Sequence, residues 1–194
     1  MKATYEKMYE SLDYGPIASA RGLVAADHVL ILFPPPGKVL CIGAGNAYEA
    51  VFLASNGYDV TVIDYVKAPV RNPKFKQIVG DATNLGAFKD DEFKLVVCCE
   101  CIEHIEETHI DKFLLGIKRV TTFFYLTIDD KDDPPYHSHL CLHEPKWWIA
   151  KFEALGFTGQ MFNPAKYAHM VGDRVLARGF PSNHGINFFG NKIL

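Results

Sequence analysis

The stretch Lys38-Val-Leu-Cys-Ile-Gly-Ala-Gly-Asn-Ala-Tyr48 decides how the rest of the chain is organised. Its apolar run, Val39 to Ile42, predicts a buried parallel strand, because strands that are covered on both faces read as continuous apolar runs. The run breaks into the glycine turn 43–47, and a helical pattern follows from Glu49. A strand, a glycine turn and a helix in this order bring free backbone N–H groups close to a ligand.

Length and composition predict one globular domain over residues 1–194, with 48% hydrophobic and 22% charged residues. The net charge of −3 does not favour nucleic acid or an anionic membrane surface as a partner. No apolar run is long enough to cross a membrane. An odd number of cysteines, placed largely in predicted strands, indicates reduced thiols and a cytoplasmic protein; they are Cys41, Cys98, Cys99, Cys101 and Cys141.

Strand and helix patterns alternate along the chain. Beyond the first strand, further strands are predicted over residues 60–63, 75–79, 93–99, 123–128, 157–162 and 174–178. Helical patterns cover residues 4–12, 17–33, 49–56, 110–120 and 144–155, with a break at Tyr14-Gly15-Pro16. This alternation predicts an α/β fold: a doubly wound, mostly parallel, Rossmann-like seven-stranded sheet with an antiparallel C-terminal edge. We expect the core over residues 38–180 and lids at residues 1–33 and 129–147.

Two aspartates stand where predicted strands end. In open α/β sheets, ligands bind outside the carboxyl ends of the strands. Asp64, which lies 19 residues after Gly45, is placed to accept hydrogen bonds from a ribose diol. Asp81 follows the third strand and can accept from an adenine amino group. The two positions predict an adenosine site, and Tyr48 at the sixth position of the glycine pattern disfavours a dinucleotide.

Together these segments resemble the class I S-adenosylmethionine-dependent methyltransferases. Val39 to Ala47 is similar to their first motif, and Gly80-Asp81-Ala82 to their adenine-contacting motif. Phe93 to Ile105 resembles the fourth motif of the E-x-x-E-H subgroup, which includes methyltransferases of type 11 and of the ubiquinone pathway. The resemblance implies S-adenosylmethionine as the cofactor, and it implies as binding residues Gly43, Ala44, Gly45, Asn46, Asp64, Tyr65, Asp81, Ala82, Cys99 and Glu100.

Two positions depart from the family's first motif. Cys41 stands where the family usually has an acidic residue, so one negative charge near the turn is missing. Ala47 replaces the last glycine, which is a mild change only if the backbone there has a negative φ. Cofactor affinity is then expected to depend more on loop carbonyls and on Tyr14 or Asn46.

Several histidines and glutamates are candidates for the chemistry. If one helix includes Glu100, Glu103 and His104, they share a face. The set resembles the metal site of small-RNA 2′-O-methyltransferases and ubiquinone-pathway O-methyltransferases, which also take a ligand from a later segment. Here His137, His139 and His143 offer such a ligand, and His139 is the one we predict. Histidine titrates near neutral pH, so His104, His139 or His143 is alternatively a general base that removes a proton from an attacking hydroxyl.

The sequence predicts a methyltransferase that uses S-adenosylmethionine. The resemblance to metal-dependent O-methyltransferases implies a divalent cation as a second cofactor. The expected acceptor is a hydroxyl of a small molecule. One alternative is a metal-assisted ribose 2′-O-methyltransferase acting on RNA or a nucleotide. Another is a cofactor-binding protein without transferase activity, because Cys41 removes an acidic residue. The segment Asp133-Pro-Pro-Tyr136 spells a motif of amino-methylating nucleic-acid enzymes, but it does not follow the fourth strand as theirs does.

Overall fold

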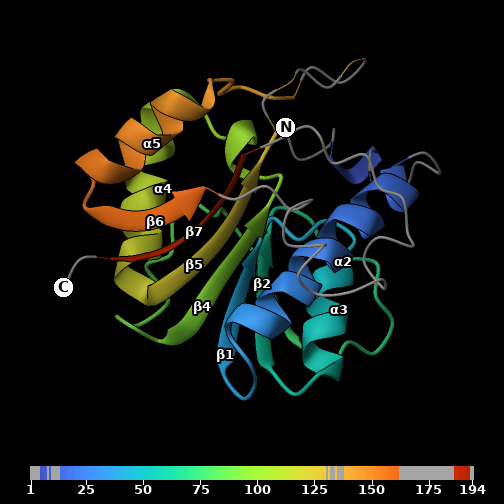
Figure 1. The fold of residues 1–194 in the computed structure, drawn as a ribbon. Coiled ribbons are helices and arrows are strands. Elements are labelled where there is room, and N and C mark those ends of the chain that lie inside the picture. The colour runs from blue at the N-terminus through green and yellow to red at the C-terminus, as the bar shows by residue number, and fades with distance from the viewer. Residues whose placement is uncertain are drawn as a thin grey trace, which may run out of the picture.

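The computed structural model describes residues 5–7, 9, 14–129, 131, 134, 138–161 and 186–192, without the side chains of residues 14–21, 159–161 and 186–192. Its centre is a seven-stranded sheet with the strand order β3-β2-β1-β4-β5-β7-β6 (Figure 1). Five of the strands are parallel: β1 Lys38–Ile42, β2 Asp59–Asp64, β3 Lys76–Val79, β4 Phe93–Cys99 and β5 Thr121–Ile128. Because β1 pairs with both β2 and β4, the strand order reverses at β1, which is where open α/β sheets bind ligands.

Helices cover both faces of the sheet. Helices α2 (Tyr14–Leu32) and α3 (Tyr48–Ser55) lie on one face, and α4 (Glu107–Val120) and α5 (Pro145–Ala154) lie on the other (Figure 1). Helix α2 begins three residues before the predicted start at residue 17, because a proline in the first helical turn loses no hydrogen bond there. Among the described helices, none combines the length and apolar composition needed to span a membrane.

Strand β1 shows how the sequence builds the two layers. Val39 and Cys41 belong to the apolar cluster under α2 and α3, whereas Leu40 and Ile42 belong to the cluster under α4 and α5. Successive strand residues point to opposite faces, so a continuous apolar run serves both cores. The expected mostly parallel Rossmann-like architecture is therefore confirmed.

The C-terminal part of the sheet differs from the expectation. Strand β7 (Ile186–Lys192) is antiparallel to β5 and to β6 (Phe157–Met161), so the antiparallel strand lies inside the sheet and β6 forms the edge. The expected antiparallel edge is thus wrong in position, and the core extends beyond residue 180. The predicted strand over residues 174–178 lies outside the described residues. Residues 186–192 carry two asparagines and a central Gly190, which weaken the strand signal in the sequence.

Candidate active site

A cavity of about 330 Å³ opens at the carboxyl ends of β1 to β4. Its wall includes Gly43 after β1, Asp64 at the end of β2, Asp81 after β3, and Glu100 after β4. These four strand ends come together because the strands are parallel and in register around β1. The cavity lies at the reversal of strand order, as the strand-end argument predicts.

The glycine turn has the left-handed backbone that glycine favours. Gly43 and Gly45 have φ angles of 66° and 52°. A Cβ atom at Gly43 would lie 2.2 Å from the Sγ atom of Cys101, so only glycine fits between β1 and Cys101, two residues after β4. Ala47 also has a positive φ, 58°, and this residue type is strained there by about 1–2 kcal/mol. The condition under which alanine would be a mild replacement is therefore not met.

Asp64 fastens the turn to the end of β2. Its Oδ2 atom accepts a hydrogen bond from the N–H of Gly45 at 3.0 Å, and its Oδ1 atom accepts one from the N–H of Val66 at 2.9 Å. The Tyr9 hydroxyl donates a third, at 3.3 Å to Oδ2. Burial raises the pKa of Asp64, and these hydrogen bonds oppose that rise. The carboxyl group is thus fixed in position while one edge faces the cavity.

Asp81 is held in a similar way at the end of β3. Its Oδ1 atom accepts a hydrogen bond from the N–H of Thr83 at 2.8 Å. Burial alone would raise the pKa of Asp81, but hydrogen bonds from Thr83 and Tyr65 and the positive charge of Lys112 lower it overall. The pKa of Tyr65 is raised to about 12 by burial and by its hydrogen bond to Asp81. Asp81 is therefore an ionised acceptor on the cavity wall at neutral pH.

The residues at this end of the cavity fit an adenosyl amino acid. The Oδ1 atom of Asn46 is buried without a hydrogen-bond partner, which leaves an acceptor for a ligand donor at the turn. The bare Gly43 permits a close approach, and Asp64 and Asp81 offer the two acceptors that a ribose and an adenine require. Of the ten predicted cofactor residues, six line the cavity: Gly43, Asp64, Tyr65, Asp81, Ala82 and Glu100. Ala44, Gly45, Asn46 and Cys99 lie outside this wall.

A buried carboxyl group stands close to Cys41. Glu49, in the first turn of α3, is 6% exposed, and a Cβ atom at Gly22 of α2 would lie 2.8 Å from its Oε2 atom. Burial, and then the charge of Asp64, raises the pKa of Glu49 to about 7. Burial, and then the charge of Glu49, raises the pKa of the Cys41 thiol. The acidic group behind the turn therefore comes from α3 instead of β1.

Two tyrosines of the N-terminal segment complete the wall, and the sequence did not identify them as site residues. Tyr5 meets the ring of His104 edge-on at 5.6 Å between centroids, and Tyr9 reaches Asp64. Their spacing of four residues places them on one side of a helix, which was a usable signal. Tyr5 and Tyr9 therefore lie against the cavity, whereas the lid over residues 1–33 stays a prediction.

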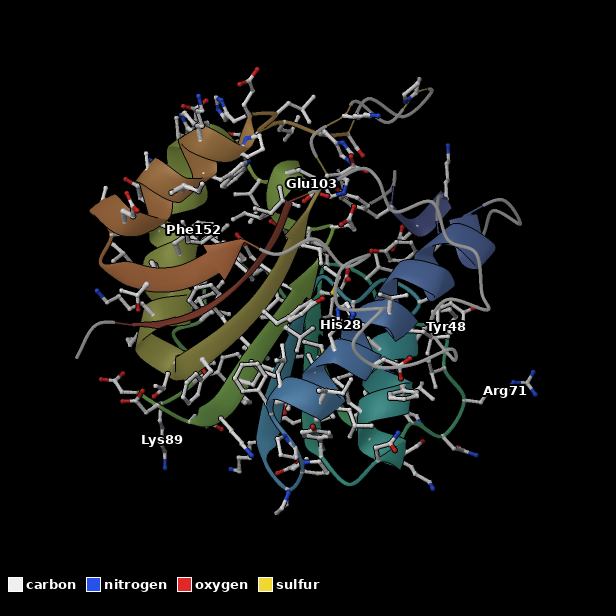
Figure 2. All side chains as sticks on the ribbon, in the orientation of Figure 1. His28, Tyr48, Arg71, Lys89, Glu103 and Phe152 are labelled. Carbon is white, nitrogen blue, oxygen red and sulfur yellow. The ribbon has the colours of Figure 1, made fainter. Side chains whose placement is uncertain are left out.

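The E-x-x-E-H segment folds differently from the expected helix. Glu100 has a φ of 52° and lies before a 3₁₀ turn, Ile102–His104, so it does not share a helical face with Glu103 and His104. Glu103 is fully buried, and Figure 2 shows it at the end of the sheet. Its Oε1 atom accepts from the N–H of Asp129 at 3.2 Å, and its Oε2 atom has no partner. Burial, and then the charge of Glu100, raises the pKa of Glu103 well above its usual range.

His104 lies on the cavity wall and is fixed by Ser138. Its Nδ1 atom is 3.1 Å from both the carbonyl oxygen and the hydroxyl of Ser138. The His139 ring meets the His104 ring edge-on at 4.6 Å. One ligand atom from each of Glu103, His104 and His139 lies within 4.8 Å of the others, which is suitable for a metal ion. Glu100 is not part of this group.

His143 does not join the other predicted catalytic histidines. Its Nε2 atom is 2.9 Å from Oε2 of Glu107, and its ring stacks on Trp147 at 3.8 Å between centroids. His143 is absent from the cavity wall. The structure thus brings His104 and His139 together and places His143 at the start of α4. His137 lies outside the described residues.

Comparison with known proteins shows which family the central part of the chain is similar to. Residues 40–122 match a family described as a methyltransferase domain. The chain is 29% identical over 87 residues to the ubiquinone biosynthesis O-methyltransferase of Rickettsia typhi, and this match covers 41% of the chain. It spans 35% of that relative, or about a third of the relative's length.

Solved structures share the fold over more of the chain. The 1,6-didemethyltoxoflavin-N1-methyltransferase of Burkholderia thailandensis, with bound 1,6-didemethyltoxoflavin and S-adenosylhomocysteine, has a TM-score of 0.72 at 16% identity, covering 99% of this chain and 85% of that one. A TehB-like S-adenosylmethionine-dependent methyltransferase of Corynebacterium glutamicum has a TM-score of 0.66 at 15% identity and 88% coverage of both chains. The family match runs from β1 to the start of β5 and so includes the glycine turn and both aspartates; this part of the chain is similar to the methyltransferase domain family.

Proposed function

We propose that the protein transfers the methyl group of S-adenosylmethionine to a hydroxyl group of a small molecule, with His104 as the general base. The cofactor supplies a methyl group on a positively charged sulfur. The acceptor oxygen forms a bond to the methyl carbon as the bond from carbon to sulfur breaks. The hydroxyl proton passes to His104, and the sulfur leaves as a neutral thioether.

The fixed ring of His104 is the observation that carries this proposal. A backbone carbonyl only accepts hydrogen bonds, so the contact with the Ser138 carbonyl places the proton of the neutral ring on Nδ1. The lone pair is then on Nε2, the nitrogen that acts as a base. The His104 ring and Glu100 line the same cavity wall, and both residues follow β4, the neighbour of β1. A base at this place contributes typically about 10²- to 10⁴-fold to the rate.

The size of the cavity supports a small acceptor. Its volume of about 330 Å³ is at the lower end of the range of about 300–1,000 Å³ for small-ligand sites. The relative from Rickettsia typhi is named an O-methyltransferase, and the structural neighbour from Burkholderia thailandensis holds a small substrate. The N-terminal segment and the segment after β5 then act as the substrate lid, because Tyr5 and His139 both contact His104.

A divalent cation is the second candidate, and the unpaired Oε2 atom of Glu103 favours it. A buried carboxyl oxygen without a partner costs about 1–3 kcal/mol, which a bound cation offsets. Glu103, His104 and His139 would hold the ion, and the ion would lower the pKa of an acceptor hydroxyl, including a ribose 2′-hydroxyl. In this version His104 is a metal ligand and not a base.

Three measurements separate these functions. Calorimetry with S-adenosylhomocysteine tests the cofactor site, and binding without any methyl transfer to pooled metabolites would indicate a binding protein. With an acceptor in hand, His104→Ala should lower kcat by about 10²- to 10⁴-fold and leave the affinity for S-adenosylhomocysteine unchanged. Glu153→Ala is the control, because Glu153 is exposed on α5 and does not line the cavity.

Chelation distinguishes the base from the metal ligand. With His104 as a base, activity survives EDTA and falls as the pH drops below the histidine pKa. Loss of activity in EDTA, restored by one divalent cation, would show that the reaction is metal-assisted and that His104 is a metal ligand and not the base. Retained activity in His104→Ala would refute both roles of this residue.

A further inference from the structure

The segment 138–144 has an inverted pattern of exposure. It belongs to no helix or strand, and its alternate residues Leu140 and Leu142 are exposed by 46% and 38%. Between and beside them, Cys141 is buried and His139 and His143 are half-buried. A segment against a core normally turns its apolar side chains inward and its polar ones outward. Here three side chains of metal-ligating type are buried or half-buried, while two leucines are exposed.

Cys141 and His143 meet a glutamate at the start of α4. One ligand atom from each of Glu107, Cys141 and His143 lies within 4.8 Å of the others. Two of these atoms, His143 Nε2 and Glu107 Oε2, are 2.9 Å apart. This cluster shares no residue with the group of Glu103, His104 and His139 near the cavity.

The surroundings hold the three side chains in place. The His143 ring stacks on Trp147 at 3.8 Å and meets the edge of Trp148 at 6.4 Å. The backbone N–H of Cys141 donates to the carbonyl of Glu103 at 2.9 Å, and its side chain lies in the core. Glu107 is the first residue of α4, so its backbone is fixed by the helix. Little side-chain freedom would be lost when an ion binds.

We propose that Glu107, Cys141 and His143 form a zinc site, in which Cys141 Sγ, His143 Nε2 and a Glu107 carboxylate oxygen are three ligands and a water molecule is the fourth. Sulfur, imidazole nitrogen and carboxylate oxygen are the donors that zinc takes in tetrahedral sites. The thiol loses its proton to solvent when the bond from sulfur to zinc forms, so binding releases about one proton. No electron is transferred.

The site would fasten the segment that carries Ser138 and His139. These residues lie three and two positions before Cys141, and both contact His104. A zinc ion joining Cys141 to the start of α4 therefore limits the movement of this segment over the cavity. The proposal stands independently of methyl transfer, because its ligands lie outside the cavity wall.

Cobalt spectroscopy on the full chain distinguishes this cluster from the one at the cavity. Co²⁺ substitutes for Zn²⁺ and gives a near-ultraviolet charge-transfer band only when a thiolate is a ligand. The band should appear in the wild-type protein, disappear in Cys141→Ser, and remain in Cys101→Ser, which keeps the cluster intact. It should also remain in His139→Ala, which disrupts the other cluster.

A second pair of variants keeps the test valid if Cys141→Ser does not fold. Glu107→Gln changes an exposed side chain and should weaken Zn²⁺ binding at least about 10-fold in calorimetry. Glu106→Gln, beside it and equally exposed, should leave the affinity unchanged. Calorimetry in buffers of different ionisation enthalpy should detect the released proton. Absence of the cobalt band, or equal Zn²⁺ affinity in Glu107→Gln and Glu106→Gln, would overturn the proposal.

Discussion

The carboxyl groups at the two ends of the cavity differ in how completely they are hydrogen-bonded. At the predicted cofactor end, Asp64 accepts hydrogen bonds from the backbone N–H groups of Gly45 and Val66, and Asp81 accepts one from that of Thr83. At the predicted acceptor end, the Oε2 atom of Glu103 is buried without a partner. Fully bonded groups hold one geometry before any ligand arrives, whereas an unbonded group gains a partner only from a ligand. The carboxyl groups of the cofactor end are thus fixed in position, whereas the carboxyl group of Glu103 at the acceptor end retains an oxygen without a partner.

The largest expected effect tests the rigid end at Gly43. Gly43→Ala places a methyl group 2.2 Å from the Sγ atom of Cys101 at a φ of 66°. Strain and overpacking together should cost about 2–6 kcal/mol in the free energy of unfolding, measured with urea, and should abolish binding of S-adenosylhomocysteine. Gly116→Ala is the control, because a Cβ atom there has only ordinary contacts and alanine stabilises a helix by about 1 kcal/mol.

A second substitution separates the two causes of this loss. Cys101→Gly in the Gly43→Ala background removes the side chain that meets the new methyl group, but it does not change the backbone angle. Partial recovery of stability is expected. A Gly43→Ala protein as stable as the wild type would show that the turn adapts, and the contrast between a rigid and an open end would then fail.

The rigid end is also the one whose position in the fold could be predicted from the sequence. Asp64 and Asp81 follow apolar runs, so strand periodicity alone located them at one sheet edge. The acceptor end depended on local conformations that periodicity does not encode. The left-handed backbone of Glu100 removed it from the expected helical face, and the segment after β5 places His139 beside His104 but His143 beside Glu107. Tyr9 reaches Asp64 across 55 residues of sequence, a distance at which no local pattern applies.

The next largest effect concerns Glu49, the one carboxyl group behind the turn whose pKa is raised to about 7 from an ordinary 4.5. A raised folded-state pKa means that the protonated form stabilises the fold. This stability is complete below about pH 4.5 and is lost as the pH rises through about 7, by about 3 kcal/mol in total. Glu49→Gln should match the wild type near pH 4.5 and exceed its free energy of unfolding by up to that amount at pH 8.

Urea unfolding at several pH values, without ligand, measures the difference between the two proteins and cancels other titrating groups. Glu153→Gln, at an exposed position of α5, is the control and should show no such pH dependence. If Glu49→Gln and the wild type keep a constant difference from pH 5 to 8, the carboxyl group is not held protonated, and the cofactor end would then contain a stable buried anion.

A smaller effect is expected at Ala47. Replacing it by glycine relieves about 1–2 kcal/mol of left-handed strain and costs about 0.5–1 kcal/mol of backbone entropy. Ala47→Gly should therefore raise the free energy of unfolding by about 1 kcal/mol or less. Ala50→Gly, in the interior of α3, should lower it by about 1 kcal/mol. Destabilisation by both variants would mean that the turn is held by its neighbours and carries no strain of its own.

The smallest effect links the two ends through Tyr9. A carboxylate has about four lone-pair positions, and Asp64 already accepts from the N–H groups of Gly45, Tyr65 and Val66 and from the Tyr9 hydroxyl. A ribose diol offers two donors, so one of them must displace the Tyr9 hydroxyl. Tyr9→Phe removes this competitor and should tighten binding of S-adenosylhomocysteine by about 2- to 10-fold in calorimetry. Tyr58→Phe loses a similar bond, to the carbonyl of Phe33, away from the cavity, and should leave affinity unchanged. Weaker binding by Tyr9→Phe would instead make this hydroxyl part of the ligand's own contacts, and the cofactor end would then be completed only when the N-terminal segment closes on it.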